Sequence, residues 1–487
     1  MLKYFFIFII ILNSFLMAQY KDFTNQLNSS YESFREESLK NRRFKHKDIK
    51  PLIENLRKNN LFRVKQLGYS AQHREIYLIS IGTGSTKLFL WSQMHGDEPT
   101  ATIALFDIFN FFSKANQFED FKKEILQKLT IYFIPMINPD GAEVYERRNI
   151  YQIDLNRDAE RLQTPEGKIL KDTFDSLKAD FGFNLHDQNI YYSAGKSFKS
   201  AAISFLAPEI NTEKTINPVR YRAMQLIGQL KDILEDFIPG HIGRYSDEFE
   251  PRAFGDNFQK WGTSTILIET GGWKDDPEKQ FLRKINFITF LAAFKSIAEG
   301  DYKNESLETY DNMPLNEEDH VMDLILRNLS YKIGDKTITV DIGINRTEVN
   351  TDSARNFYLD GKVVDIGDLS IYSGYEDYDL SGMEIAEGKT YEDNFSSFEE
   401  LKKLNFTDLY SGGYTDILIT FPVKEEHTRL PINLVLSNKR KDGIIRVDTP
   451  ANFYITHGGK VKYVVVNGFL IETAKPQTDN VNGSVIH

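Results

Sequence analysis

Apolar residues before about residue 299 follow two spacings in turn. Dense runs of β-branched and aromatic residues predict buried strands, and apolar residues three or four positions apart predict helices. The expected strands are 75–81, 88–92, 131–137, 181–185 and 265–268, and the expected helices are 48–58, 100–112, 219–237 and 278–298. This alternation is typical of an α/β domain with a mostly parallel or mixed twisted sheet and helices on both faces.

The pattern changes near residue 300. Residues 301–320 are polar and acidic, and we interpret them as a linker. Beyond them, period-two alternation predicts strands at 337–344, 414–421, 432–436, 444–447, 453–456 and 461–466. His457-Gly458-Gly459-Lys460 predicts a tight hairpin between the last two strands. The chain therefore divides into an α/β domain over 19–300 and a smaller, mainly-β accessory domain over 321–487, built as a sandwich or barrel.

Residues 1–18 have the layout of a secretory signal peptide. Lys3 precedes an apolar run from Tyr4 to Ile11, and Ala18 supplies the small residue near the cleavage point. The run is short for a membrane-spanning helix. We therefore expect an exported protein, periplasmic or extracellular, without a stable membrane span once the signal is removed.

Composition narrows the possible chemistry. The 487 residues carry a net charge of -11, which argues against a nucleic-acid partner. The absence of cysteine excludes disulfides, thiolate nucleophiles and Cys-ligated metals. Any metal must therefore be bound by Asp, Glu or the nine His residues. The sequence leaves the oligomeric state open.

Three residues that follow expected strands are candidate metal ligands. His95 and Glu98 come after strand 88–92, and their spacing lets one turn bring both side chains together. Taken alone, such a pair is more often an ordinary helix start. His186 ends strand 181–185, at the edge where open α/β sheets bind ligands. Two His and one carboxylate would bind one Zn²⁺ ion and leave a position for water, as in catalytic zinc sites.

Further polar motifs follow other strands. Glu269 ends strand 265–268, where it could pair with a basic residue or act as a general base toward metal-bound water. Residues 138–141 (NPDG) have the composition of a turn. Arg147 and Arg148 follow, and then comes the DLNRD motif at 154–158. Arginines can bind a substrate carboxylate or stabilise an oxyanion.

In this order the motifs, together with Gly68-Tyr69-Ser70 and Arg74, resemble those of the zinc metallocarboxypeptidase (carboxypeptidase A-like) family over residues 61–273. The resemblance implies that His95, Glu98 and His186 are the zinc ligands and that Glu269 is the general base. It implies substrate-contacting roles for the remaining matched residues. These are Arg147 for the carbonyl oxygen, with Arg148 as the alternative, Asn156 and Arg157 for the terminal carboxylate, and Tyr245 for the family's mobile tyrosine.

Some positions depart from the family pattern or stay open. Gln152 stands where the family often has Gly, two residues before the DLNR aspartate. Arg252 and Asp256 lie where the family forms its specificity pocket, so either could select a charged side chain, or the two could pair with each other.

The resemblance implies hydrolysis of the C-terminal amide bond of peptides, by zinc-activated water with a Glu general base. The substrate would be a peptide or a cell-wall peptide. One alternative is a zinc amidase or deacylase acting on cell-wall peptides or N-acyl amino acids. Another is a non-catalytic binding protein on the same scaffold, against which the presence of all three ligands and the base argues.

Overall fold

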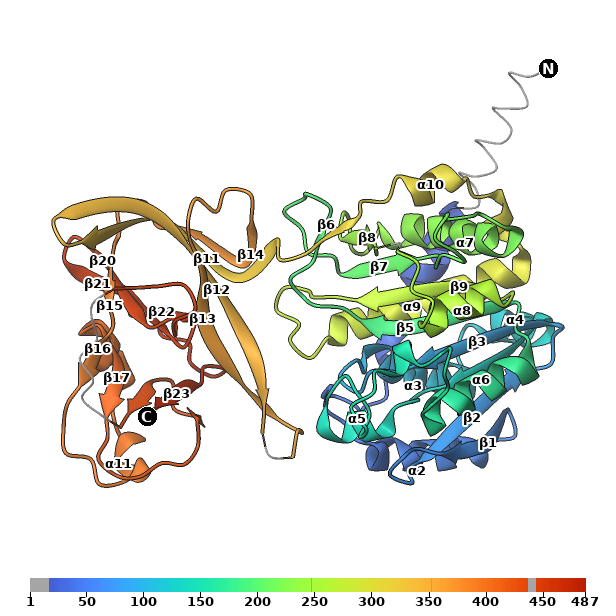
Figure 1. Ribbon diagram of the computed structural model, residues 1–487, viewed down its shortest axis with the longest axis horizontal. Helices are drawn as coiled ribbons and strands as arrows, with labels where there is room; N and C mark the ends of the chain where they lie inside the picture. Colours follow the sequence, from blue (N-terminus) through green and yellow to red (C-terminus); the bar gives the residue numbers. More distant parts are fainter. Residues whose placement is uncertain (1–16, 247, 352, 437–443) are drawn as a thin grey trace, which may run out of the picture. The chain divides into compact units, whose positions relative to one another are not determined.

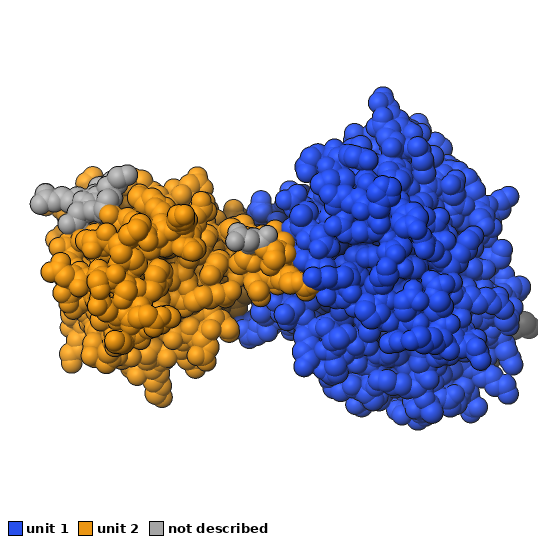
Figure 2. Space-filling view, turned by 90° about the horizontal axis from the view of Figure 1, so that it is seen from below, with its two compact units in different colours: residues 1–319 blue, residues 320–487 orange. Residues whose placement is uncertain are grey.

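The computed structural model describes residues 17–246, 248–351, 353–436 and 444–487. The chain forms two compact units that divide between Asp319 and His320 (Figure 1, Figure 2). Residues 17–30 are helical, and Tyr20 within them is fully buried. Residues 1–16, which hold most of the expected signal peptide, lie outside the described part, so that expectation remains a prediction.

One eight-stranded mixed sheet forms the centre of the first unit, in the order β1-β2-β4-β3-β5-β9-β7-β8. The central strands β4, β3, β5 and β9 run parallel, and antiparallel strands flank them. The strands are β1 (Phe62–Tyr69), β2 (Glu75–Gly82), β3 (Thr86–Ser92), β4 (Leu129–Ile134), β5 (Phe181–Asp187), β7 (Ile203–Leu206), β8 (Ile242–Arg244) and β9 (Ser264–Thr270). The predicted mixed α/β sheet is confirmed.

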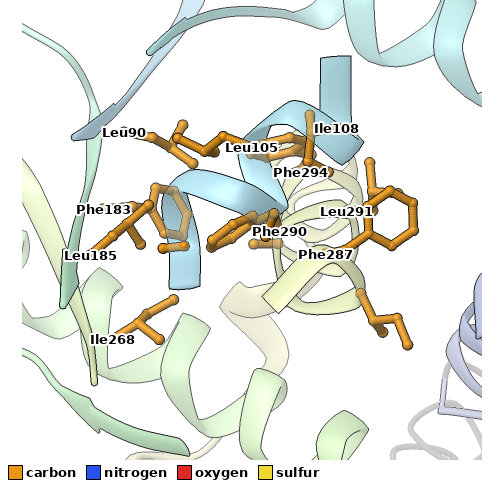
Figure 3. Close-up of a cluster of buried hydrophobic side chains, with 14 of the residues drawn as sticks. Leu90, Leu105, Ile108, Phe183, Leu185, Ile268, Phe287, Phe290, Leu291 and Phe294 are labelled. Carbon is orange, nitrogen blue, oxygen red and sulfur yellow. The ribbon is translucent and has the colours of Figure 1, made fainter. Parts of the chain in front are cut away.

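Helices cover both faces of this sheet. Successive residues of β3 point to opposite faces: Leu88 and Leu90 join one apolar cluster with α3 and α9, and Phe89 and Trp91 join another with α6 and α8. Figure 3 shows part of the first cluster, where side chains of β3, β5 and β9 meet those of α3 and α9. The helices are α2 (His46–Arg57), α3 (Thr100–Ser113), α4 (Glu119–Lys128), α5 (Pro139–Val144), α6 (Pro165–Leu177), α7 (Pro218–Leu234), α8 (Phe254–Lys260) and α9 (Gln280–Glu299).

Two local expectations near β4 need correction. The strand predicted over 131–137 ends at Ile134, because Pro135 has no N–H to donate to a neighbouring strand. The NPDG segment is a helix start rather than an isolated turn. Asn138 accepts a hydrogen bond from the Gly141 N–H (2.9 Å), and Pro139 occupies the first turn of α5.

The expected linker is also corrected, because residues 301–319 belong to the first unit. They form a 3-10 turn at Asp301–Asn304, helix α10 (Leu307–Asp311) and strand β10 (Asn316–Glu317), which pairs with β6 (Ser193–Ala194). Tyr302, Tyr310 and Met313 are buried in the main apolar cluster. The acidic residues therefore mark the exposed side of a packed segment, not a solvated connection.

The second unit is mostly β and contains two sheets. The larger has the order β13-β12-β11-β15-β20-β21-β22, with β14 beside β11, and the smaller has the order β16-β17-β19-β23-β18. The strands are β11 (Val321–Ile333), β12 (Lys336–Asn350), β13 (Phe357–Gly367), β14 (Ser373–Asp379), β15 (Glu384–Glu387), β16 (Lys389–Tyr391), β17 (Tyr414–Leu418), β18 (His427–Thr428), β19 (Asn433–Val435), β20 (Phe453–His457), β21 (Lys460–Val466), β22 (Phe469–Glu472) and β23 (Gly483–Ile486). Two short helices, α11 (Phe398–Leu401) and α12 (Phe406–Ser411), complete the unit.

The hairpin predicted around His457-Gly458-Gly459-Lys460 is confirmed, since both glycines adopt the positive φ of a two-residue turn (57° and 74°). The strand predicted over 444–447 is wrong, because this stretch has no strand pairing and leads into a turn. Among the described residues, no helix is both long enough and apolar enough to cross a membrane.

Candidate metal centre

The candidate ligands meet at the carboxyl edge of the central parallel strands. His95 and Glu98 lie in the loop between β3 and α3, while His186 and Glu269 lie on β5 and β9 as direct cross-strand partners. Parallel neighbours end at the same edge of a sheet, which brings together residues far apart in sequence. Gly96 allows this loop to approach α5, because a Cβ there would lie 2.0 Å from the carbonyl carbon of Gly141.

The Glu98 carboxylate bridges the two histidines. Its Oε1 lies 2.7 Å from Nδ1 of His95, and its Oε2 lies 2.7 Å from Nδ1 of His186. One ligand atom from each of the three residues falls within 4.8 Å of the others, and all three residues are buried. The predicted trio therefore converges on a single point with two nitrogen donors and one oxygen donor.

The other ring nitrogen of His95 contacts a second carboxylate. Its Nε2 lies 3.0 Å from Oδ1 of Asp154, the first residue of the DLNRD motif. A carboxylate in this position fixes the ring and leaves Nδ1 to bind a metal. Asp154 also accepts hydrogen bonds from Arg147, whose Nε and Nη2 lie 3.1 and 3.0 Å from Oδ2.

The pKa values of the three candidate ligands are shifted in different directions. Burial lowers the pKa of His95, but the charge of Glu98 and the hydrogen bond to Asp154 outweigh it and raise that pKa to about 9. Burial raises the pKa of Glu98, but the two imidazoles hold it well below its usual range. For His186, burial dominates and lowers the pKa. The carboxylates are thus held as anions between nitrogen ligands.

Glu269, the carboxyl group next to the ligand trio, has its pKa shifted in the direction opposite to that of Glu98. Burial, and next the charge of Glu98, raise the pKa of Glu269 well above its usual range. Its Oε2 is buried and has no hydrogen-bond partner among the described residues. A carboxyl group with a raised pKa and an unused oxygen beside a metal site has the properties of a general base.

The residues present fit a zinc ion. Two imidazole nitrogens and one carboxylate are the donors that catalytic zinc takes. The other ring nitrogen of His186, Nε2, is buried and has no hydrogen-bond partner within the described part of the chain. The ring therefore bonds only through Nδ1, to Glu98.

The two adjacent arginines, Arg147 and Arg148, have different surroundings. Nη1 of Arg147 lies 3.1 Å from Nδ1 of His95 and 3.3 Å from Oε1 of Glu98, so its guanidinium borders the ligand trio. Arg148 instead donates to the carbonyl oxygen of Gln152 (2.9 Å) at the surface. Arg147, not Arg148, is therefore the arginine that the fold brings to the candidate centre.

The two residues expected to bind a terminal carboxylate lie together near the start of α8. Oδ1 of Asn156 accepts a hydrogen bond from the N–H of Phe254 (2.9 Å). Arg157 donates to the carbonyl oxygen of Asn156, and its Nε lies 3.2 Å from Oε2 of Glu250. The guanidinium of Arg157 is thus already paired with a carboxylate of the protein.

The suggested pairing of Arg252 with Asp256 is not what the structure has. Arg252 binds Glu250 instead, with both oxygens engaged at 2.9 and 2.7 Å, because the two residues flank one turn. Asp256 accepts the Glu250 N–H (3.0 Å). Burial raises the pKa of Asp256 to about 7. Both residues hold the loop before α8, so neither is free to act solely as a selector of charged side chains.

Tyr245 follows β8 and reaches the side of the centre that holds Glu269. Its N–H donates to the carbonyl oxygen of Phe205 (2.9 Å), and Phe205 pairs with Ile268, next to Glu269. Burial, and then the Glu269 charge, raise the pKa of Tyr245 to about 12. A neutral phenol is therefore available near the general base.

Sequence reasoning missed the polar groups behind the ligands. The side chain of Asp187, next to His186, is buried, and its Oδ2 accepts a hydrogen bond from Thr100 (2.6 Å) and lies 3.3 Å from Nζ of Lys279. Lys279 also donates to the carbonyl oxygen of Thr270 (3.0 Å). This lysine links the ends of β5 and β9. A motif search could have found Asp154, within DLNRD, but not Lys279, which lies in an ordinary polar turn.

Part of the chain is similar to a known protein family. The sequence profile of the zinc carboxypeptidase family matches residues 49–206, which hold the ligand trio, Arg147 and the DLNRD motif. This part of the chain is therefore similar in sequence to zinc carboxypeptidases. The matched range ends before Tyr245 and Glu269.

Two of the proteins that the chain matches in sequence are named as carboxypeptidases. The chain is 28% identical over 116 residues to a probable carboxypeptidase 2 of Arthroderma benhamiae, over 23% of this chain and 21% of that protein. It is equally identical, over the same length, to carboxypeptidase 2 of Trichophyton rubrum, over 23% of this chain and 20% of that one. The chain thus spans about a fifth of the length of these relatives.

The chain can be partly superposed on solved structures, among them a metallo-carboxypeptidase from Burkholderia cenocepacia. That structure is 14% identical, with a TM-score of 0.42 over 53% of this chain and 70% of that one. A metallo-carboxypeptidase from Pseudomonas aeruginosa is 19% identical, with a TM-score of 0.41 over 53% and 70%.

Proposed function

We propose that this protein is a zinc metallocarboxypeptidase that hydrolyses the C-terminal amide bond of peptides. The observation that carries the proposal is the buried convergence of His95, Glu98 and His186 beside Glu269, a carboxyl group with an unused oxygen. A site built only for stability would satisfy its buried polar atoms. This one keeps them available at the sheet edge where α/β domains bind ligands.

His95, Glu98 and His186 would hold the zinc ion. When bound, zinc supplies Lewis acidity, which lowers the pKa of a water molecule and polarises a carbonyl group. Glu269 would take the proton of that water and later deliver it to the leaving amine. The raised pKa of Glu269 suits this exchange, because it makes the carboxylate a stronger base than an exposed glutamate.

Arg147 and the Asn156–Arg157 pair would bind the substrate on either side of the reacting carbon. Arg147 borders the ligand trio, where its guanidinium can donate to a carbonyl oxygen as that oxygen gains negative charge. Asn156 and Arg157 would bind the terminal carboxylate and so select the last amide bond. Tyr245 would close against the bound substrate, with Arg148 remaining at the surface.

Incubation of the zinc-loaded protein with a peptide mixture, followed by mass spectrometry, tests this proposal. We expect residues to be released one at a time from free C-termini, and we expect no release after zinc is removed with a chelator. Internal cleavage, or equal release without zinc, would contradict the proposal. The same experiment with a peptide library varied at the last position would define side-chain preference.

One observation favours the alternative of a zinc amidase acting on cell-wall peptides or N-acyl amino acids. Arg157, the expected ligand of a terminal carboxylate, is already paired with Glu250. Matched peptides with a free and an amidated C-terminus separate the two activities. A carboxypeptidase requires the free carboxylate, whereas an amidase would process both forms and would also release products from muropeptides.

We also infer that the protein is exported to the periplasm or outside the cell. The basic, apolar and small-residue order of residues 1–18 supports this location. Expression of the full chain followed by N-terminal sequencing of the exported form tests it. The expected new terminus lies near Gln19, and retention of Met1 on protein in the cytoplasm would contradict it.

A further inference from the structure

The segment Pro314–Glu318 runs between β8 and β6, the strands next to Tyr245 and Tyr192. On one side, Arg244 donates its N–H to the carbonyl oxygen of Pro314 (2.7 Å). On the other, Asn316 and Glu317 form β10, which pairs with β6. Arg244 directly precedes Tyr245, and Tyr192 directly precedes β6. The segment therefore contacts the backbone next to both tyrosines, and we refer to it as the strap.

Asn316 anchors the strap to strands that carry the site. Its Oδ1 accepts a hydrogen bond from Ser204 (2.9 Å), and its Nδ2 donates to Oε1 of Gln188 (2.7 Å). Ser204 is the cross-strand partner of Glu269, and Gln188 lies two residues after His186. Gly243 is required for this approach, because a Cβ there would lie 2.1 Å from Oδ1 of Asn316.

Glu318 reaches Tyr245 through Tyr192. The Tyr192 hydroxyl donates to Oε1 of Glu318 (2.6 Å), a short charge-assisted hydrogen bond. The rings of Tyr192 and Tyr245 lie with their centroids 6.1 Å apart at an angle of 58°. This chain of contacts links a strap carboxylate to the phenol beside Glu269.

We propose that the strap is a positioning element of the active site, in which Glu318, through Tyr192, orients the ring of Tyr245 on the side of the metal centre that holds Glu269. This inference rests on the proposed function for its kinetic consequence. Glu318 touches neither the ligand trio nor Glu269, so it acts only through other residues. A side chain that is held in its productive orientation by packing and hydrogen bonds from neighbouring residues raises the reaction rate, because fewer unproductive orientations are populated.

The kinetic test compares Glu318→Ala with Glu308→Ala in the full-length, zinc-loaded protein. Glu308 is an exposed residue of α10, ten positions earlier, and its substitution removes the same charge. We expect Glu318→Ala to lower kcat about tenfold with KM and zinc affinity within about twofold of wild type, and Glu308→Ala to match wild type. Glu318→Gln, which retains a hydrogen-bond acceptor, should recover most of the loss.

A double-variant comparison tests whether the effect passes through Tyr245. In a Tyr245→Phe background, the further Glu318→Ala change should lower kcat by less than about twofold, since coupled residues are not additive. An undiminished tenfold effect in that background would overturn the proposal, as would equal kcat values for the Glu318→Ala and Glu308→Ala variants.

Hydrogen exchange keeps the inference separate from the proposed function. The amides of residues 244–246 should exchange about tenfold faster in Glu318→Ala than in Glu308→Ala, because the strap contact next to them opens more often. This readout needs no hydrolysis. Unchanged exchange would overturn the positioning role even in an active enzyme, whereas altered exchange in a protein that hydrolyses nothing would reject only the peptidase assignment.

Discussion

The Asp107–Arg283 pair and the His95–Glu98–His186 cluster are both buried in the first unit, but they use their polar atoms differently. Each carboxylate oxygen of Asp107 accepts two hydrogen bonds. Oδ1 accepts from Arg283 (2.6 Å) and from the N–H of Glu36, and Oδ2 accepts from Arg283 (2.7 Å) and from Tyr31. Arg283 further donates to the carbonyl oxygens of Leu39 and Glu36.

In the cluster at the sheet edge, some buried polar atoms make no hydrogen bond to the described residues. Nε2 of His186 and Oε2 of Glu269 are buried without a hydrogen-bond partner in the described chain. Because an unmet buried polar group costs free energy, such a group persists where it has another task. In this comparison, the structural ion pair has both carboxylate oxygens fully bonded, whereas the ligand cluster keeps buried polar atoms that no described residue bonds. The following variants test this division, from the largest expected effect to the smallest.

Replacing Glu269 should remove activity and leave the fold intact. Glu269→Gln keeps the size of the side chain but cannot take a proton, so we expect peptide hydrolysis to fall about 10³-fold, in the range of general-base catalysis. Zinc content, measured by elemental analysis, should match wild type, and the thermal midpoint should not fall. Hydrolysis at the wild-type rate would contradict the assignment of Glu269 as the base.

Replacing His186 should remove the metal. We expect His186→Ala to weaken zinc binding by more than about 100-fold, because a ligand contributes more than the outer partners that tune it. Competition with a chromogenic chelator measures this affinity. Zinc at about 1,000 times the wild-type Kd should stabilise wild type by about 4 kcal/mol and the variant by no more than about 1.4 kcal/mol, because a 100-fold weaker site is then at about 10 times its own Kd. Equal stabilisation of both proteins would show that zinc binds elsewhere.

Replacing Asp107 should have the opposite signature. Asp107→Ala leaves the fully buried guanidinium of Arg283 without its partner, which should cost about 3–5 kcal/mol of unfolding free energy. Urea denaturation measures the loss, and zinc affinity of the folded protein should stay unchanged. If zinc affinity fell as far as in His186→Ala, the division between a structural and a functional cluster would fail.

Asp256 should make the stability of the folded protein depend on pH. Its pKa is about 7 in the folded protein against an ordinary value of 3.8, so the folded state holds this proton more tightly than the unfolded state. Its contribution to stability is therefore full below pH 3.8 and declines as the pH rises toward 7, by up to about 1.4 kcal/mol per pH unit.

Asp256→Asn should remove that part of the pH dependence, because the amide oxygen can still accept the Glu250 N–H. Urea denaturation of both proteins at pH 5 and pH 8 measures the difference, with the exposed Asp172→Asn as the matched control. We expect the Asp256 variant to lose less stability than wild type between the two pH values. Identical curves would mean that Asp256 does not titrate in this range.

Much of the candidate site could be predicted from the sequence, because its residues follow strands. His186 and Glu269 lie at the ends of the dense apolar runs that form β5 and β9, and His95 lies three residues after β3. The parallel order of these strands then follows from the alternation of strands and helices. Where local chemistry was ambiguous, prediction failed: the acidic segment 301–319 looked like a linker, but its few apolar residues, such as Tyr310, are buried in the core.

The sequence by itself determined the ligand types and the α/β class, since periodicity and strand-end positions are local properties of the chain. Only the tertiary structure decided between Arg147 and Arg148, because neighbouring side chains of an irregular segment point in different directions. It alone paired Arg157 with Glu250, and it alone brought Glu318 to Tyr192, 126 residues away. Such contacts depend on which surface segments fold against the same sheet edge, and no local spacing encodes that.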